Sequence, residues 1–246
     1  MTHRTLLRSL LLAGLLIAVA PVAAAQALTV YAAASLRDAF PRIDGSPTYN
    51  FAGSNQLQAQ IERGAPADVF VSASPTEAQA LFRENRCTRP VTMATNILVI
   101  ITPKGNPSGV RSVYSLRTGS RRLSVGTAGV PIGVYTRQML RRLRLTSILS
   151  TNRVSLDPNV TAITSKVALG SADAGFVYIT DAKSVADRTE TIRLPRWAQP
   201  PVRYQICAVR RSGADTSGAQ AFISKVRSTN GRRVLRSYGF GLPPRS

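Results

Sequence analysis

Short apolar runs alternate with helical patterns along most of this chain, and this alternation is what most limits the folds open to it. The first series has apolar runs at residues 28–32, 49–51 and 68–72, and the second has them at 97–102, 123–126, 154–156 and 174–178. An order of strand, helix and strand favours a parallel sheet covered by helices. We therefore expect two α/β units, followed by a strand at 204–209 and a helix at 222–238.

Residues 1–27 have the pattern of a secretory signal peptide. Arg4 and Arg8 precede an apolar run at 10–20, and Ala25-Gln26-Ala27 is a small-residue cleavage pattern. The alternative is a membrane anchor, but the run has 11 residues, whereas a helix across the bilayer needs roughly 20. We expect an exported mature chain that begins near Leu28 and is periplasmic or otherwise extracytoplasmic.

The chain is strongly basic, with 32 Lys and Arg residues against 12 Asp and Glu. The predicted signal peptide holds two of the Arg residues and no acidic residue, which leaves a net charge of +18. Such a charge favours anionic partners. A nucleic-acid or anionic-surface binder is one alternative, and its affinity would fall steeply with salt. Because the basic residues are scattered over helical patterns, we instead expect a charged outer surface and no role for nucleic acid.

Cysteine and histidine usage narrows the chemistry. The mature chain contains Cys87 and Cys207, and an isolated pair in an oxidising compartment predicts a disulfide. The only histidine, His3, lies in the signal peptide, so a zinc site and a His-based catalytic triad are excluded from the mature chain. Without a His base, Ser35 and Ser54 are not activated nucleophiles. We expect a protein that is not an enzyme.

Small residues and a serine follow two strands of the first unit, in Ala32-Ala-Ala-Ser35 and Phe51-Ala-Gly-Ser54. Small residues let an anion approach the backbone, and helix N-termini present free N–H groups with a favourable dipole. A serine at the helix cap adds a hydroxyl donor. The simpler reading of both serines is a plain N-cap. A helix at 36–40 is expected to end at Pro41.

The second unit offers two similar junctions and a tyrosine. Pro131 suits the first turn of a helix and precedes Ile132, while Asn159 is a cap candidate before Val160. Tyr178 ends a strand opposite them. Ligands of open α/β sheets bind beyond the carboxyl ends of the strands, so these groups should meet the two serines in a cleft without Lys or Arg.

Neutral donors of this kind suit a fully deprotonated dianion, whereas an anion that keeps a proton needs an acceptor. Asp157 is the one acidic residue at these junctions. We interpret it as a loop or cap residue, and Asp68 and Asp181 as structural hydrogen-bonding groups.

Six segments resemble the periplasmic molybdate-binding family, in the same order along the chain. They are Val30-Tyr-Ala-Ala-Ala-Ser-Leu36, the 22-residue block 49–70, Pro103-Lys-Gly-Asn-Pro107, Val130-Pro-Ile-Gly-Val-Tyr135, Ala174-Gly-Phe-Val-Tyr-Ile-Thr-Asp-Ala182 and Tyr238-Gly-Phe-Gly241. The resemblance implies an α/β, two-lobed type II periplasmic-binding-protein fold, each lobe a mainly parallel sheet covered by helices. Lobe one would be residues 28–93 plus 201–246, and lobe two residues 94–200.

The resemblance also implies a function and a site. The protein would capture molybdate or tungstate for the membrane permease of an ABC importer, as a monomer without cofactor or direct protein–metal ligand. Sulfate, another tetrahedral oxyanion, is the alternative. The implied ligand-binding groups are the hydroxyl and N–H groups of Ser35 and Ser54, the N–H groups of Ile132 and Val160, and the phenol of Tyr178.

Overall fold

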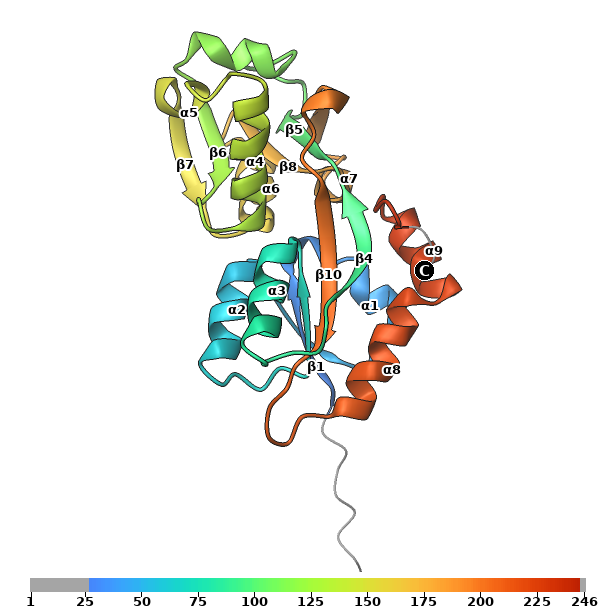
Figure 1. Ribbon diagram of the computed structural model, residues 1–246. Helices are drawn as coiled ribbons and strands as arrows, with labels where there is room; N and C mark the ends of the chain where they lie inside the picture. Colours follow the sequence, from blue (N-terminus) through green and yellow to red (C-terminus); the bar gives the residue numbers. More distant parts are fainter. Residues whose placement is uncertain (1–26, 244–246) are drawn as a thin grey trace, which may run out of the picture.

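The computed structural model describes residues 27–243 as two groups of strands and helices, one above the other in Figure 1. Each group is built on a five-stranded sheet, with strand orders β2-β1-β3-β10-β4 and β7-β6-β8-β5-β9. The predicted two-lobed α/β architecture is confirmed. The predicted signal peptide lies, except for its last residue, outside the described residues.

The first sheet contains β1 (Thr29–Ala33), β2 (Thr48–Ala52), β3 (Val69–Ser72), β4 (Val91–Asn96) and β10 (Val202–Ala208). Strand β1 pairs in parallel with β2 and β3, and β10 is antiparallel to β3 and β4, so four strands point one way and β10 the other. Successive side chains of a strand face opposite sides of the sheet. Phe70 accordingly packs in one buried cluster, whereas its neighbours Val69 and Val71 pack in another.

Helices cover both faces of the first sheet (Figure 1). One side carries α2 (Ser54–Glu62) and α3 (Pro75–Arg83), and the other carries α1 (Phe40–Ile43), α8 (Thr216–Arg227) and α9 (Thr229–Ser237). Leu57 and Ile61 of α2 and Leu81 of α3 belong to the same cluster as Phe70. On the opposite side, the rings of Phe40 and Phe222 meet edge to face, with centroids 5.7 Å apart.

The second sheet contains β5 (Leu98–Pro103), β6 (Arg122–Gly126), β7 (Arg153–Asp157), β8 (Ala174–Tyr178) and β9 (Thr189–Arg193). Strand β5 alone runs against the other four. The helical segments of this half are η2 (Val113–Thr118), α4 (Pro131–Arg142), α5 (Ile148–Thr151), α6 (Val160–Ala168), α7 (Ile179–Ser184) and η3 (Arg196–Ala198). Both sheets are therefore mainly parallel, as expected.

The chain crosses between the two sheets twice. It leaves the first sheet at the end of β4 and enters β5 within two residues, and it returns through η3 into β10. Gln199 joins the two crossings, because its side chain accepts a hydrogen bond from the Leu98 N–H and donates one to the Leu98 carbonyl, each at 2.8 Å. Strand β4 continues to Asn96, so the first sheet extends past residue 93.

Two helix predictions are wrong. Pro41 lies in the first turn of α1, where its missing N–H has no intrahelical partner to lose, and the residues before it form the short 3₁₀ helix η1 (Ala34–Leu36). Instead of the single helix expected at 222–238, the structure has two helices, α8 and α9, which meet at Ser228. The Ser228 hydroxyl accepts a hydrogen bond from the Gly231 N–H and thereby caps the second of them.

The predicted disulfide is absent from this structure. Cys87 and Cys207 are free thiols in the same buried cluster. The Cys87 thiol donates instead to the Ala78 carbonyl at 3.7 Å. Burial raises the pKa of the Cys207 thiol well above its ordinary value, so this group is held as a neutral thiol.

None of the helices within residues 27–243 is both long enough and apolar enough to cross a membrane.

Candidate ligand-binding site

A pocket lies between the two sheets, with an empty volume of about 220 Å³ that includes open solvent at its mouth. All five predicted site residues line it: Ser35, Ser54, Ile132, Val160 and Tyr178. The remaining lining residues are apolar apart from Asn159, and none of the described residues that line it is Lys, Arg, Asp or Glu. The structure thus brings the predicted groups together in a pocket without charged side chains.

Four helical N-termini meet at this pocket. Ser35 lies in η1, Ser54 begins α2, Ile132 is the second residue of α4, and Val160 begins α6. First-turn N–H groups have no intrahelical acceptor, and the N-terminal end of a helix carries a partial positive charge. The first turns of these four described helices contain no acidic residue, so no carboxylate of their own offsets that charge.

Local sequence explains how α4 comes so close. Pro131 occupies its first turn, with a backbone already suited to a helix. A Cβ atom on Gly133 would lie 1.9 Å from the Thr127 carbonyl oxygen. Only glycine therefore lets the start of α4 pack directly on the end of β6, which places the Ile132 N–H at the pocket.

The two serines lie at the predicted positions but are not helix caps. The N-cap of α2 is Gly53 and that of η1 is Ala33. The Ser54 hydroxyl, 1% exposed, accepts a hydrogen bond from the Ala73 N–H at 3.0 Å. Since this bond uses a lone pair of the oxygen, the hydroxyl proton remains available to a ligand. The Asn159 cap is confirmed, because its side chain accepts a hydrogen bond from the Ala162 N–H at 3.0 Å.

Tyr178 provides the strongest sign that a polar ligand belongs here. It ends β8 and is 1% exposed, yet its phenolic oxygen has no hydrogen-bond partner among residues 27–243. Burial raises the pKa of Tyr178 well above its ordinary value, and the neighbouring Tyr204 and Tyr135 contribute to the shift. The phenol is therefore a neutral donor, and leaving such a buried group unpaired is unfavourable unless a ligand satisfies it.

Asp157 is a strand residue with structural partners, and not the loop or cap residue that was predicted. It ends β7, accepts a hydrogen bond from the Ser124 hydroxyl at 2.6 Å and forms an ion pair with the Lys166 ammonium at 2.5 Å. It does not line the pocket. The predicted pocket therefore gains no carboxylate acceptor from this junction.

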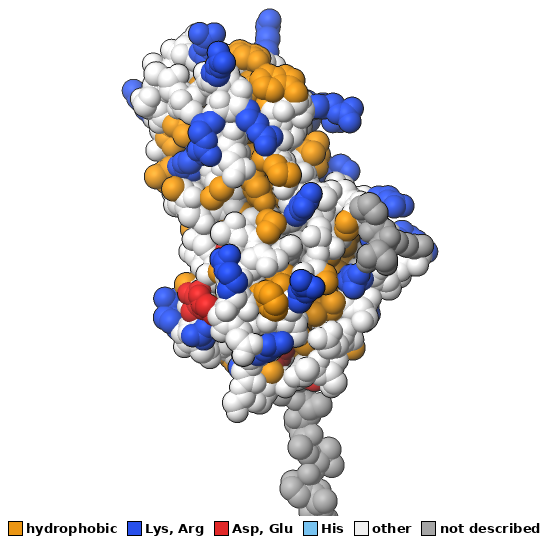
Figure 2. All heavy atoms as spheres, viewed as in Figure 1, with side chains coloured by type: hydrophobic (Ala, Val, Ile, Leu, Met, Phe, Trp, Pro, Cys, Tyr) orange, Lys and Arg blue, Asp and Glu red, His pale blue; other side chains and the backbone are white. Residues whose placement is uncertain are grey.

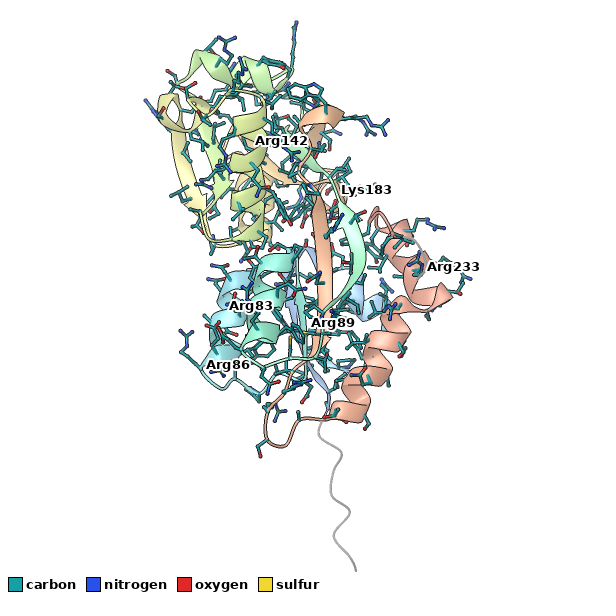
Figure 3. All side chains as sticks on the ribbon, viewed as in Figure 1. Arg83, Arg86, Arg89, Arg142, Lys183 and Arg233 are labelled. Carbon is teal, nitrogen blue, oxygen red and sulfur yellow. The ribbon has the colours of Figure 1, made fainter. Side chains whose placement is uncertain are left out.

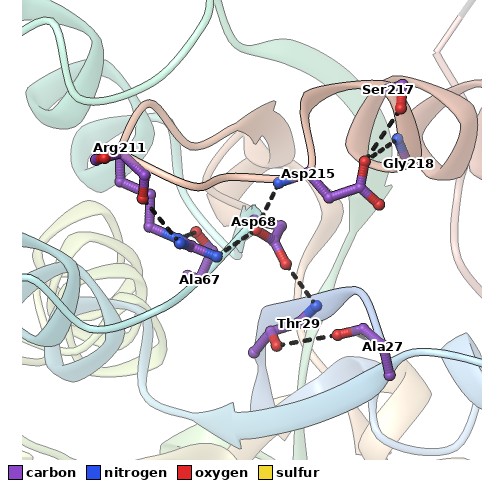
Figure 4. A network of polar contacts seen from close by, with 9 residues as sticks. Ala27, Thr29, Ala67, Asp68, Arg211, Asp215, Ser217 and Gly218 are labelled. Atoms are coloured by element: carbon purple, nitrogen blue, oxygen red, sulfur yellow. Dashed lines mark hydrogen bonds and ion pairs between the residues drawn. The ribbon is translucent and has the colours of Figure 1, made fainter. Parts of the chain in front are cut away.

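Asp68 is structural too, and lies at the far end of its strand from the pocket. Its carboxylate accepts from the Thr29 N–H at 2.9 Å, the Arg211 guanidinium at 2.6 Å and the Asp215 N–H at 3.2 Å (Figure 4). These bonds join the start of β1 to the segment between β10 and α8.

Asp181 lines a larger polar cavity that adjoins the pocket at Ser35. Its carboxyl accepts a hydrogen bond from the Thr180 hydroxyl at 3.3 Å. The pKa of Asp181 is raised to about 8, mainly by burial. The hydrogen bond from Thr180 lowers this pKa, and the negative charge of the nearby Asp38 raises it. This carboxyl is consequently protonated over most of the physiological pH range.

The sequence did not indicate Tyr204 as a site residue. This side chain is fully buried, and its phenolic oxygen lies 2.8 Å from the Ser35 hydroxyl oxygen. The one sequence feature that could have indicated Tyr204 as a site residue is its position. It is the first residue of the predicted strand 204–209, just after the second crossing between the lobes.

The basic residues lie on the outside of the molecule, as predicted. On the face shown in Figure 2, Lys and Arg side chains are scattered over both halves and acidic side chains are few. Arg83, Arg142 and Arg233, labelled in Figure 3, are exposed residues of α3, α4 and α9. The positive charge therefore surrounds a pocket that contains none.

Comparison with known proteins defines the class. The family model described as bacterial extracellular solute-binding protein matches residues 28–241. The chain belongs to this family. It is an extracytoplasmic solute-binding protein and not an enzyme.

Individual relatives have names that are more specific than the family description. The molybdate-binding protein ModA of Mycobacterium tuberculosis is 35% identical, over 91% of this chain and 87% of the relative. The protein of the same name from Haemophilus influenzae is 32% identical, over 89% and 91%. The solved periplasmic molybdate-binding protein of Azotobacter vinelandii superposes with a TM-score of 0.77 at 22% identity, over 88% of this chain and 100% of that one. This last likeness shows the fold.

Proposed function

We propose that this protein binds molybdate or tungstate in the pocket and presents it to an ABC importer. The observation that carries the proposal is the buried, unpaired phenol of Tyr178 in a pocket lined by neutral hydrogen-bond donors. The names of these Mycobacterium tuberculosis and Haemophilus influenzae relatives, each more than 30% identical to this chain, support molybdate as the ligand.

The chemistry of the lining favours an anion without protons. Hydrogen bonds from neutral groups to a charged partner stabilise binding by roughly 1.5–3 kcal/mol each. Hydrogen phosphate carries a proton that needs an acceptor, and no carboxylate from residues 27–243 lines the pocket. Sulfate satisfies the same donors and differs in size, so it is the second candidate.

The proposed ligand bridges the two lobes. Ser35 and Ser54 belong to lobe one, residues 28–93 plus 201–246, and Ile132, Val160 and Tyr178 belong to lobe two, residues 94–200. Closure would be a hinge motion at the two crossings. The loaded, closed monomer would then dock on a membrane permease in the periplasm.

Calorimetric titration of the purified protein with molybdate, tungstate, sulfate and phosphate tests this function. We expect molybdate and tungstate to bind most tightly, with sulfate weaker and phosphate weakest. Absence of molybdate binding, or equal binding of phosphate, would contradict the proposal. Repeating the titration at high salt separates it from an anionic-surface binder, whose affinity would fall steeply, because a buried site is screened much less.

A further inference from the structure

We infer that Asn96, Tyr204 and Ser35 form a hydrogen-bond relay that directs the Ser35 hydroxyl proton into the pocket, so that the site selects oxyanions without protons. In this arrangement Tyr204 and Asn96 are positioning residues that act through Ser35. The inference rests on the proposed function, because it assumes that the pocket holds an oxyanion.

The relay begins at Asn96, whose amide orientation is set by the backbone. Asn96 ends β4 and is 6% exposed. Its side-chain oxygen accepts a hydrogen bond from the Ile97 N–H at 3.0 Å. An N–H group can only donate, so the amide nitrogen of Asn96 must be on the other side. That nitrogen donates to the Thr180 hydroxyl at 3.0 Å and to the Tyr204 phenolic oxygen at 3.4 Å.

Tyr204 passes this direction on to Ser35. Its oxygen accepts from Asn96, and an amide nitrogen offers no lone pair, so the phenolic proton must point elsewhere. The other polar atom bonded to it among the described residues is the Ser35 hydroxyl oxygen at 2.8 Å. Burial raises the pKa of Tyr204 well above its ordinary value, so the phenol keeps its proton. Its ring is held edge to face against Tyr178 and Phe240, at centroid distances of 5.9 and 5.3 Å.

Ser35 therefore accepts from Tyr204 and has its own proton free for the pocket. The Ser54 hydroxyl proton is likewise free for the pocket, because the Ser54 oxygen accepts a hydrogen bond from the Ala73 N–H. With Tyr178 as a third hydroxyl donor, all three of these hydroxyl groups in the lining are free to donate to a ligand oxygen. A ligand O–H would meet a donor and lose its hydrogen bond to water, which discriminates strongly against protonated oxyanions.

The variant Tyr204→Phe removes the proton that fixes Ser35 and keeps the ring. Ser35 could then accept from a protonated ligand. We expect the affinity for molybdate to fall about three- to tenfold, in line with a partly lost hydrogen bond. Affinity for hydrogen phosphate should stay the same or rise. The ratio of the two dissociation constants, measured by competition at about pH 8 where both ions are dianions, is the decisive readout.

Tyr49→Phe is the matched control. It removes a tyrosine hydroxyl in the same lobe that donates to the Asp44 carbonyl at 2.6 Å, away from the pocket. The ratio should not change in this variant.

Asn96→Asp is an independent variant that reverses the relay without changing its shape. The new carboxylate accepts from Tyr204, so Tyr204 accepts from Ser35 and the Ser35 proton turns away from the pocket. The added negative charge weakens both dianions alike and cancels in the ratio. We expect the dissociation constants for molybdate and hydrogen phosphate to come closer together, as in Tyr204→Phe. This variant decides the matter if Tyr204→Phe does not fold.

Combination with Ser35→Ala separates positioning from a structural role. With no hydroxyl to orient, adding Tyr204→Phe should leave the ratio unchanged. An equal change in the presence and absence of Ser35 would overturn the relay, as would an unchanged ratio in both Tyr204→Phe and Asn96→Asp. Failure of the wild-type protein to bind molybdate would instead overturn the proposed function itself.

Discussion

Gly53 lies so close to Pro158 across the pocket that a Cβ atom on Gly53 would be 2.5 Å from the Pro158 carbonyl oxygen. Gly53 precedes α2 in lobe one, and Pro158 precedes α6 in lobe two. A second contact of this kind brings Gly129 of lobe two near the Asn55 side chain of lobe one, at 3.5 Å from an added Cβ atom. The two lobes are consequently in close contact beside the pocket, and this contact leaves no room for a side chain at residue 53.

Gly53→Ala should hinder closure without disturbing lobe one. The backbone angles of Gly53, φ −64° and ψ 137°, suit any residue. An added Cβ atom would meet the ends of the Asn55 and Gln56 side chains of lobe one at 3.0 and 3.2 Å, and these ends can move, so the severe clash is the one with the Pro158 carbonyl oxygen of lobe two. Forcing a methyl group into a packed contact costs about 1–3 kcal/mol, which corresponds to an affinity loss of roughly 5- to 100-fold. Calorimetric titration with molybdate measures the loss of affinity. Urea unfolding without ligand checks that the stability of the protein is unchanged.

Gly45→Ala is the control for this prediction, because a Cβ atom there meets its nearest neighbour, the Pro41 carbonyl oxygen, at an ordinary 3.6 Å. Molybdate affinity equal to wild type in Gly53→Ala would mean that the liganded form is more open than this structure.

Tyr178→Phe should have opposite effects on binding and on stability. Loss of one hydrogen bond to the oxyanion predicts about 10- to 100-fold weaker binding. Without ligand, the phenolic oxygen is buried and unpaired among the described residues, so its removal should leave the free energy of unfolding unchanged or higher by about 1 kcal/mol. Urea unfolding without ligand checks this. A clear loss of stability would show that the phenol has a partner in the empty protein.

The positions of the predicted donors followed from local patterns. Ser54, Ile132 and Val160 each come just after a strand ends and where a helix begins, and the signals for such junctions are small residues, proline and a capping side chain within a few positions. Because parallel strands end at the same edge of a sheet, the prediction of mainly parallel sheets was enough to gather these groups.

Features that depend on tertiary pairing were not predictable in this way. Ser35 and Tyr204 are 169 residues apart, and no local pattern links them. Strand β9 has the mostly polar sequence Thr-Glu-Thr-Ile-Arg, and is a strand because it pairs with β5 at the edge of the second sheet. The cap assigned to Ser54 failed since Gly53 already occupies that position, which leaves the hydroxyl free to bond Ala73.

Asp181→Asn should change how stability depends on pH. The folded-state pKa of about 8 lies above the ordinary value of 3.8, so the folded protein holds a proton that the unfolded chain releases. This group therefore favours folding at low pH, and its contribution is lost as the pH rises from about 4 to about 8, by up to about 1.4 kcal/mol per pH unit. The free energy of unfolding of the asparagine variant, relative to that of the wild type, should therefore increase as the pH rises across that range.

Urea unfolding of both proteins at about pH 5, 6.5 and 8 measures the difference, and the variant should show its largest advantage at pH 8. A constant difference across the three pH values would show that Asp181 is ionised in the folded protein.

Ser54→Ala should weaken both binding and the fold. The hydroxyl is one of the proposed donors to the oxyanion, so its loss predicts about 10- to 100-fold weaker molybdate binding. It is also the acceptor for the buried Ala73 N–H, and leaving that group unpaired costs about 1–3 kcal/mol of unfolding free energy. The exposed Ser46, whose hydroxyl donates to Asp44 at 2.8 Å, provides the control Ser46→Ala, which should change neither quantity. A folded Ser54→Ala protein with wild-type molybdate affinity would remove Ser54 from the site and, with it, the pocket as the place where the oxyanion binds.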